Sequence, residues 1–396
     1  MANLKKALIF YLYGNRNAGD MAICIGAIEL LKSKGYAVTM VSRFSESEEE
    51  YFKSKQYVAE YYPDVKIYPG PFSFERHFSR TKKIISYCKS YMKVLGLISD
   101  NQTRELIQEA DVVFFNGGNL LRGASLSDYL RLIGLFYPIK IAHKMNKPLY
   151  CLPQSTAKVS CMGKKLLGKY LKMFDKVYVR EENSYLKLKS LFSNIPFELT
   201  TDLAFFSENT DLASKKMSAL GYHFNPEKKN VAIILRNSGI GDIGELDNEI
   251  AQKLNNIVES FIYKHLDYNY FLIVQTEKDR NVSHTFMQKL NDNVNVKQIE
   301  LHDPLLLREI YKKMSFTISM RLHAAILSLS ALTPVYGVFS EKWGLKNSGI
   351  MDSYNMPYCI VETKEKLSIE TDNVFKKNVQ DNIMSVIKRN RNKFNF

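Results

Sequence analysis

The sharpest chemical cluster in this 396-residue chain is Arg321 followed two residues later by His323. Both come directly after an apolar run, Phe316–Ser319, and lie at the start of a helical pattern of small apolar residues. A guanidinium, an imidazole and the N–H groups of a helix N-terminus together form a concentrated site for an anion. A buried arginine without a partner would be costly, so we interpret the pair as functional.

A second arginine, Arg236, ends another apolar run, residues 231–235, in the same half of the chain. Each planar guanidinium can bind one carboxylate or phosphate through two parallel hydrogen bonds. We therefore expect Arg236 and Arg321 to bind a single small ligand that carries both groups.

Another cluster covers residues 14–20, Gly-Asn-Arg-Asn-Ala-Gly-Asp, between the first apolar run and the first helical pattern. Glycines permit a tight turn there, and the N–H groups of the following helix can bind an anion. Capping of that helix would by itself explain Asp20. The loop has neither the lysine of a P-loop nor the spacing of a dinucleotide-binding loop.

Polar residues also follow three other apolar runs, at Asn116-Gly117-Gly118-Asn119, Pro153-Gln154-Ser155 and Thr200-Thr201-Asp202. Two adjacent glycines at a strand end indicate close approach by a ligand or by neighbouring backbone, and a plain turn is the alternative. For Asp202 we expect a structural role, in which its hydrogen bonds hold the exit from the first domain.

The elements that must position these clusters alternate regularly along the chain. Strands are predicted at 7–13, 37–42, 65–68, 111–115, 149–152 and 176–179, and helices at 21–34, 127–144 and 164–174. The pattern restarts with strands at 231–235, 270–275, 296–299, 316–319 and 335–339, and helices at 249–265, 284–290, 304–314, 324–332 and 373–389. Apolar runs between helices are typical of a parallel sheet covered on both sides.

The predicted fold is therefore α/β, with two tandem doubly wound, Rossmann-like domains at residues 1–205 and 231–396 and a hinge at 206–230. In open α/β sheets, ligands bind beyond the carboxyl ends of the strands. We expect the two domains to face a central cleft, as in GT-B-like enzymes. A loop with Gly239, Gly241 and Gly244 follows the first strand of the second domain.

Charge and composition narrow the partners. Lysine and arginine total 55 against 41 acidic residues, and the net charge of +14 indicates an anionic ligand or surface. For the scattered lysines we favour the alternative, a surface charge that keeps the protein in solution. Aromatic residues lie mainly inside apolar runs instead of between arginines, which argues against nucleic acid. The basic segment 388–393, with Phe394 and Phe396, suits peripheral contact with an anionic membrane.

The cysteines show no spacing typical of a zinc site, so no metal is expected. The first apolar run is too short for a signal peptide, and none is long enough to span a bilayer. We expect a cytoplasmic protein, with contact at the inner face of the plasma membrane as a variant of that expectation.

Taken in order, the motifs resemble those of the polysaccharide pyruvyl transferase family. The similarity runs collinearly from about Gly14 to Gly349, and the Arg321-Leu322-His323 element is its most specific part. The motifs that carry it are residues 14–20, 116–120, 153–155, 179–184, 201–204, 319–324 and 342–349. The family often has three glycines where this chain has Gly117-Gly118-Asn119, so the resemblance does not extend to the acceptor sugar.

The resemblance implies transfer of a pyruvyl group from phosphoenolpyruvate to two hydroxyls of a sugar, which leaves a cyclic ketal and phosphate. The acceptor would be a surface-polysaccharide precursor for capsule or cell wall, free or lipid-linked. No cofactor is implied, because phosphoenolpyruvate is a co-substrate and the arginines supply the positive field.

Roles follow for individual residues. Donor binding is assigned to Arg236, Arg321, the Leu322 N–H, His323 and Lys342, with Lys346 as an alternative to Lys342. His323 is expected to act either as the general acid or as a phosphate ligand. Asp20 is the candidate base for an acceptor hydroxyl that Asn17 positions. The remaining acceptor-side residues are Gly117, Gly118, Asn119 and Gln154.

Two other functions remain open from the sequence. A GT-B glycosyltransferase would bind a nucleotide sugar and would need an acidic residue for the ribose, for which Glu341 is the candidate. A non-catalytic polyanion-binding protein would show strongly salt-dependent affinity and release no phosphate.

Overall fold

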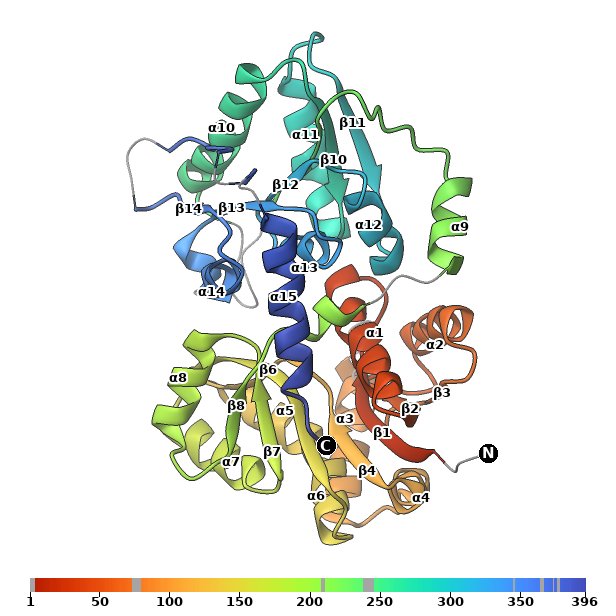
Figure 1. Ribbon diagram of the computed structural model, residues 1–396. Helices are drawn as coiled ribbons and strands as arrows, with labels where there is room; N and C mark the ends of the chain where they lie inside the picture. Colours follow the sequence, from red (N-terminus) through yellow and green to blue (C-terminus); the bar gives the residue numbers. More distant parts are fainter. Residues whose placement is uncertain are drawn as a thin grey trace. The chain divides into compact units, whose positions relative to one another are not determined.

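The computed structural model describes residues 4–72, 80–207, 211–237, 246–344, 346–363, 367–372, 374–375 and 378–396. The chain forms two compact units, each built on a parallel β-sheet (Figure 1). The first unit comprises Met1–Asn15, Ile23–Leu203 and Asn395–Phe396, and the second comprises Arg16–Ala22 and Ala204–Phe394. The glycine-rich loop with Gly239, Gly241 and Gly244 lies outside the described residues.

The first unit contains an eight-stranded sheet in the order β3-β2-β1-β4-β6-β7-β8, with β5 paired to β6. Its strands are β1 (Lys5–Leu12), β2 (Tyr36–Ser42), β3 (Lys66–Tyr68), β4 (Val112–Phe115), β5 (Gly118–Gly123), β6 (Leu149–Val159), β7 (Lys176–Val179) and β8 (Phe197–Leu199). Strand order proceeds outward in both directions from β1 and β4, so the fold is doubly wound as predicted.

The helices of this unit alternate with its strands. They are α1 (Ala18–Ser33), α2 (Glu49–Tyr61), α3 (Arg80–Leu95), α4 (Asn101–Glu109), α5 (Leu126–Leu135), α6 (Tyr137–Lys144), α7 (Cys161–Leu171) and α8 (Glu182–Leu191). The prediction of one helix over 127–144 is wrong, because α5 ends before Phe136 and α6 starts anew with Pro138 in its first turn. Proline lacks the N–H that a continuous helix requires at that position.

The second unit has a six-stranded parallel sheet in the order β11-β10-β9-β12-β13-β14. Its strands are β9 (Asn230–Ile234), β10 (Asn269–Val274), β11 (Val296–Glu300), β12 (Phe316–Ser319), β13 (Val335–Phe339) and β14 (Tyr358–Ile360). Its helices are α9 (Asp211–Ala219), α10 (Asn248–Lys264), α11 (Arg280–Lys289), α12 (Pro304–Tyr311), α13 (Leu322–Ser330), α14 (Lys346–Ser353) and α15 (Val379–Asn392). Every residue of β9, β10, β12 and β13 is buried, as expected for strands covered on both faces.

The boundary between the units falls at Leu203–Ala204, two residues before the predicted end of the first domain. The stretch expected as a hinge, 206–230, contains α9 and belongs to the second unit. Two short exchanges complete the division, since Arg16–Ala22 belongs to the second unit and Asn395–Phe396 to the first. The predicted domain bounds were continuous ranges of sequence, so they did not include these two exchanges.

The aromatic residues of the C-terminal tail pack inside the protein. Phe394 is fully buried, and its ring meets that of Phe206 edge-on with centroids 5.7 Å apart. The ring of Phe396 lies 4.9 Å from Phe114 and 5.2 Å from Tyr150. The expectation that the Phe394 ring faces a membrane is therefore wrong, and the half-buried Phe396 packs against aromatic rings of the first unit. Among the described residues, no helix is both long and apolar enough to cross a bilayer.

Candidate functional site

The pairing of β9 and β12 brings the two predicted arginines to equivalent positions. In this parallel pair Ser319 lies opposite Ile234, and the Met320 N–H donates to the Ile234 carbonyl over 3.0 Å. Arg321 and Arg236 each follow two residues later, at the carboxyl ends of neighbouring strands. This register brings the two arginines to neighbouring strand ends, and their shared role in one site stays a prediction.

A buried carboxylate holds Arg321 in place. The Nε and one terminal nitrogen of its guanidinium donate to the two carboxylate oxygens of Asp279, which is 0% exposed. Asp279 ends the short 3₁₀ helix η2 (Glu277–Asp279) after β10, and the Thr276 hydroxyl donates to it over 3.3 Å. Such a two-pronged pair fixes the plane of the guanidinium as well as its position.

Arg236 is more deeply buried than Arg321. Its side chain is 7% exposed, and its guanidinium carbon lies 4.8 Å from the ring centre of Trp343. Burial, with the nearby charge of Arg321, lowers the pKa of Arg236 to about 9, and the attraction of Asp279 only partly opposes this. The two guanidiniums therefore create a positive potential that an anionic ligand would relieve.

Helix α13 begins beside these arginines. The Ser319 hydroxyl donates to the Arg321 carbonyl over 2.8 Å and accepts from the Arg321 N–H over 3.1 Å, which shapes the turn into the helix. Leu322 and His323 form the first turn of α13, where backbone N–H groups point out of the helix end. The imidazole and the helix N-terminus thus lie on the same strand end as Arg321.

The segment Arg16–Ala22 contributes to the same unit. Gly19 lies so close to His323 that an added Cβ would be 2.2 Å from its Nδ1, and only glycine permits this approach. Asn17 caps the start of α1, because its side-chain oxygen accepts from the Gly19 N–H over 3.0 Å. Its amide nitrogen also donates to Asp20 over 3.0 Å. The predicted residues Asn17 and Asp20 are therefore in one compact unit with Arg236, Arg321 and His323.

Lys342 lies in the 3₁₀ helix η3 (Glu341–Trp343), and its ammonium group pairs with Asp247. The two side chains are 39% and 69% exposed, so this is a surface ion pair. The structure thus gives Lys342 a partner within the protein, at the surface.

The acceptor-side residues predicted from the sequence belong to the first unit. Gly117 is packed tightly, since an added Cβ would lie 2.9 Å from both Leu203 and the Pro153 carbonyl. Gly118 has a φ of +135°, and an added Cβ would lie 2.7 Å from the Tyr13 hydroxyl. Both glycines serve close packing at the point where β4 passes into β5.

Gln154 is fully buried and holds this region together. Its amide nitrogen donates to the Asn116 carbonyl over 2.6 Å, and its oxygen accepts from the Leu120 N–H over 3.1 Å. These bonds give Gln154 a supporting role for the Gly117-Gly118 turn. Asn119 follows at the start of β5 and is half-buried.

Asp202 forms a buried ion pair with Arg180, with 2.6 Å between Nη1 and Oδ2. Arg180 also donates from Nε to the Ser155 hydroxyl over 2.5 Å. The structural role predicted for Asp202 at the exit from the first domain is confirmed.

Sequence reasoning missed two residues of the arginine site, Asp279 and Trp343. Asp279 follows a strand end, as Arg236 and Arg321 do, but it lies five residues beyond the end of β10. Trp343 is the chain's single tryptophan and follows β13 closely, a position that could have marked it. In the part of the chain that the structure describes, no three His, Cys, Asp or Glu side chains are grouped to hold a metal ion.

Comparison with known proteins assigns a family. A model of the family described as polysaccharide pyruvyl transferase matches residues 17–340, which is most of the chain. No curated protein matches the chain in sequence.

Solved structures resemble both units together. UDP-GlcNAc 2-epimerase from Neisseria meningitidis, bound to UDP-GlcNAc, has a TM-score of 0.54 at 13% identity, with 98% of this chain and 95% of that chain covered. A glycosyltransferase from Rickettsia africae has a TM-score of 0.54 at 11% identity, with 98% and 93% covered. At such identities the likeness shows the fold alone, which is GT-B-like with two Rossmann-like domains.

Proposed function

Because the chain belongs to the polysaccharide pyruvyl transferase family, we propose that it transfers a pyruvyl group from phosphoenolpyruvate to two hydroxyls of a saccharide. The observation that carries this proposal is the pair of arginines at matching strand ends, the buried Arg236 and the partly buried Arg321. Phosphoenolpyruvate carries one carboxylate and one phosphate, and two guanidinium groups are complementary to that charge distribution.

The reaction needs one proton delivered to carbon 3 and two removed from hydroxyls. Protonation of carbon 3 makes carbon 2 electrophilic, and the first hydroxyl adds there as it loses its proton. The second hydroxyl then displaces phosphate from carbon 2, loses its proton and closes the ketal ring. The departing phosphate takes the C–O bonding electrons, so one of the two hydroxyl protons replaces that used at carbon 3 and the other leaves with phosphate.

His323 is the group proposed to move a proton in this sequence, as acid toward carbon 3 or as a hydrogen-bond donor to the leaving phosphate. Its place in the first turn of α13 supports either role, since the helix N-terminus stabilises negative charge that develops on phosphate. The Leu322 N–H belongs to the same turn.

Asp20 is proposed as the base for an acceptor hydroxyl. The Asn17 amide that donates to Asp20 supports this role, because it fixes the orientation of the carboxylate. Gly117, Gly118, Asn119 and Gln154 are proposed to shape the acceptor side, the glycines and Gln154 through packing. No metal or cofactor is part of this proposal.

The acceptor is proposed to be a surface-polysaccharide precursor made at the cytoplasmic side of the membrane. A direct test is phosphate release from phosphoenolpyruvate in the presence of a panel of free and lipid-linked saccharides. The proposal expects release that depends on both substrates and a product with a pyruvyl ketal by mass spectrometry. Phosphate release without any acceptor, or none with the whole panel, would count against it.

A nucleotide-sugar glycosyltransferase is the rival function, since the solved neighbours include glycosyltransferases. Glu341, the candidate ribose partner, has its backbone N–H bound to the Glu362 carboxylate over 3.1 Å. Thermal shift separates the two functions, because a ligand that binds only the folded protein raises its midpoint. Stabilisation by phosphoenolpyruvate and none by UDP supports pyruvyl transfer, and the reverse supports glycosyl transfer.

A further inference from the structure

A second arginine cluster lines a cavity of about 370 Å³ in the first unit. The cavity lies near the carboxyl ends of three strands. Tyr11 is the second-last residue of β1, Arg43 directly follows β2, and Phe72 follows β3 by four residues. This edge of an open parallel sheet is where ligands bind in doubly wound folds.

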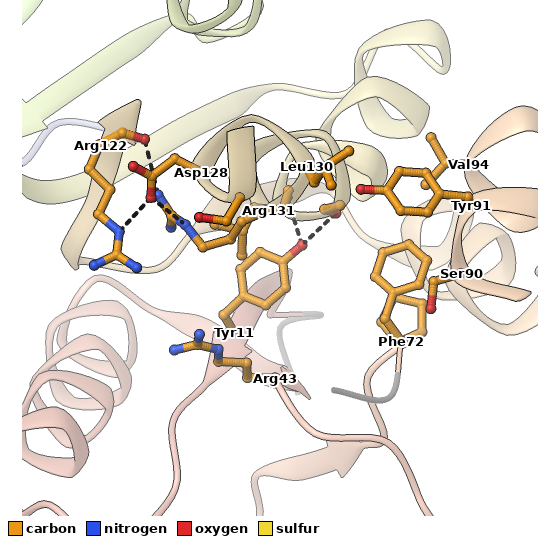
Figure 2. A pocket seen from close by; sticks show the side chains of 14 residues that line it. Tyr11, Arg43, Phe72, Ser90, Tyr91, Val94, Arg122, Asp128, Leu130 and Arg131 are labelled. Carbon is orange, nitrogen blue, oxygen red and sulfur yellow. Dashed lines mark hydrogen bonds and ion pairs between the residues drawn. The ribbon is translucent and has the colours of Figure 1, made fainter. Parts of the chain in front are cut away.

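One end of the cavity is charged. Arg43, Arg122 and Arg131 line it together with Asp128, which is the single carboxylate among the described lining residues (Figure 2). Asp128 lies 2.9 Å from the Arg122 Nε and 3.7 Å from the Arg131 Nε. Among the described lining residues, three guanidiniums and one carboxylate give an excess of two positive charges.

The electrostatics of Arg131 agree with this excess. Its terminal nitrogen donates to the Leu120 and Arg122 carbonyls over 3.0 and 3.1 Å, which holds it over the cavity. Burial, with the charges of Arg122 and Arg43, lowers the pKa of Arg131 to about 10, although Asp128 pulls it the other way. A dianion placed here would relieve that repulsion.

The other end of the cavity is apolar. Figure 2 shows Phe72, Tyr91, Val94 and Leu130 on the side away from Arg122 and Asp128. Tyr11 lies between the two ends, and its hydroxyl is occupied by a 2.6 Å hydrogen bond to the Leu135 carbonyl. Apart from the hydroxyls of Ser90 and Tyr91, the described residues of this wall offer no side-chain hydrogen-bonding group, and this favours a hydrocarbon substituent over a sugar or nucleobase.

We propose that this cavity binds the phosphate or diphosphate of an aliphatic phosphoester, with the guanidiniums on the phosphate and the apolar wall on the hydrocarbon chain. If the proposed function holds, on which this extension rests, the phosphoester is the carrier end of the saccharide acceptor. The binding site itself does not depend on the pyruvyl transfer reaction.

Calorimetric titration of the full chain with octyl phosphate, kept below its micelle-forming concentration, tests the site. Inorganic phosphate and UDP serve as comparison ligands, and phosphoenolpyruvate is titrated into the same sample. Octyl phosphate should bind at least about tenfold more tightly than inorganic phosphate, because each buried methylene contributes up to ~0.8 kcal/mol. Binding no tighter than that of inorganic phosphate would overturn the proposal.

Substitutions assign the two ends of the ligand. Arg43→Gln and Arg122→Gln should each lower the affinity for octyl phosphate roughly tenfold, since each removes one charged hydrogen-bond donor. Arg104→Gln, on the exposed face of α4, is the matched control and should change nothing. Val94→Asn should lower the affinity for octyl phosphate severalfold without changing the affinity for inorganic phosphate, because it alters only the apolar wall.

The remaining outcomes are equally informative. Octyl phosphate affinity that is unchanged in Arg43→Gln and Arg122→Gln would place the ligand elsewhere and overturn the assignment. UDP binding tighter than octyl phosphate, with the same dependence on arginine, would overturn the aliphatic part. If the protein does not bind octyl phosphate but still releases phosphate from phosphoenolpyruvate, the cavity proposal alone is overturned. If the protein binds octyl phosphate as expected but does not bind phosphoenolpyruvate, the proposed pyruvyl transfer function alone is overturned.

Discussion

Two arginine clusters, one in each unit, illustrate how burial decides what a positive site can bind. In the second unit Arg236 and Arg321 are held by Trp343 and Asp279 in a tightly packed strand-end site. In the first unit, Arg43, Arg122 and Arg131 line a cavity with a long apolar wall. The first arrangement suits a compact ligand that is charged throughout, and the second suits a charged group with a hydrocarbon attached.

The clusters differ also in chemistry. The site in the second unit has an imidazole beside its arginines, His323, and a helix N-terminus on the same turn. The cavity in the first unit has tyrosine hydroxyls, and that of Tyr11 is committed to a backbone carbonyl. We therefore propose that bond making takes place in the second unit's site and that the cavity serves binding alone.

Substitution of His323 should have the largest effect on turnover and so give the clearest test of the difference between the two arginine clusters. His323→Gln is expected to lower turnover by ~10²–10⁴-fold, since it removes a group that moves a proton, and to change donor affinity far less. Turnover and calorimetric affinity are measured on the same preparation. His302→Gln, in the same unit beside Glu300, is the control. Normal turnover in His323→Gln would remove the imidazole from the chemistry.

The close approach of Gly19 to His323 gives the next largest effect. Gly19→Ala introduces a Cβ that would lie 2.2 Å from Nδ1, so the imidazole must shift. A displacement of about 1 Å at a reacting group can cost roughly 10²-fold in rate. Gly35→Asn is the matched control, because nothing lies within 4 Å of an added Cβ and asparagine tolerates the positive φ there. Equal turnover in the two variants would show that this contact does not position His323.

The buried arginine of the second unit should make donor binding sensitive to alkaline pH. The pKa of Arg236 is lowered to about 9 by burial and by Arg321, so its charge is present below that pH and lost above it. Phosphoenolpyruvate affinity should fall about tenfold between pH 8 and pH 10, as the protonated fraction falls. Arg236→Gln should bind more weakly at pH 7.5 and show no such fall. A flat profile in the wild-type protein would place the donor away from Arg236.

The smallest effect is expected at the exposed lysine. Lys342 pairs with Asp247 at the surface, where such pairs contribute about 0–1 kcal/mol. Lys342→Gln should therefore change phosphoenolpyruvate affinity less than about fivefold. Lys312→Gln, which breaks the pair with Glu309, is the control for loss of charge. A loss as large as that of an arginine variant would return Lys342 to the donor site.

Much of the fold could be predicted because apolar runs of the second unit coincide with strands buried on both faces. Arg236 and Arg321 could be placed together for the same reason, since strand ends of a parallel sheet converge. The break between α5 and α6 was predicted poorly, although Pro138 marks it, because the apolar spacing continues across it.

The partners of the site residues could not be predicted from local pattern. Asp279 pairs with Arg321 although 42 positions separate them in the sequence. The convergence of strand ends does not say which carboxylate will pair with the arginine. Gln154 was expected beside the acceptor, but both ends of its amide are used by backbone groups within the first unit. The cavity of the first unit escaped notice because Arg43, Arg122 and Arg131 come from three separate elements.

Calorimetric titration with phosphoenolpyruvate tests the central claim most directly. Arg321→Ala alone would leave the buried Asp279 carboxylate without its partner, at a cost of ~3–5 kcal/mol in folding stability. The informative protein is therefore Arg321→Ala combined with Asp279→Asn, with thermal unfolding as the check that it folds. We predict that the wild-type protein binds phosphoenolpyruvate and that the folded double variant loses at least about 10²-fold in affinity. Undiminished affinity in that variant would contradict the account.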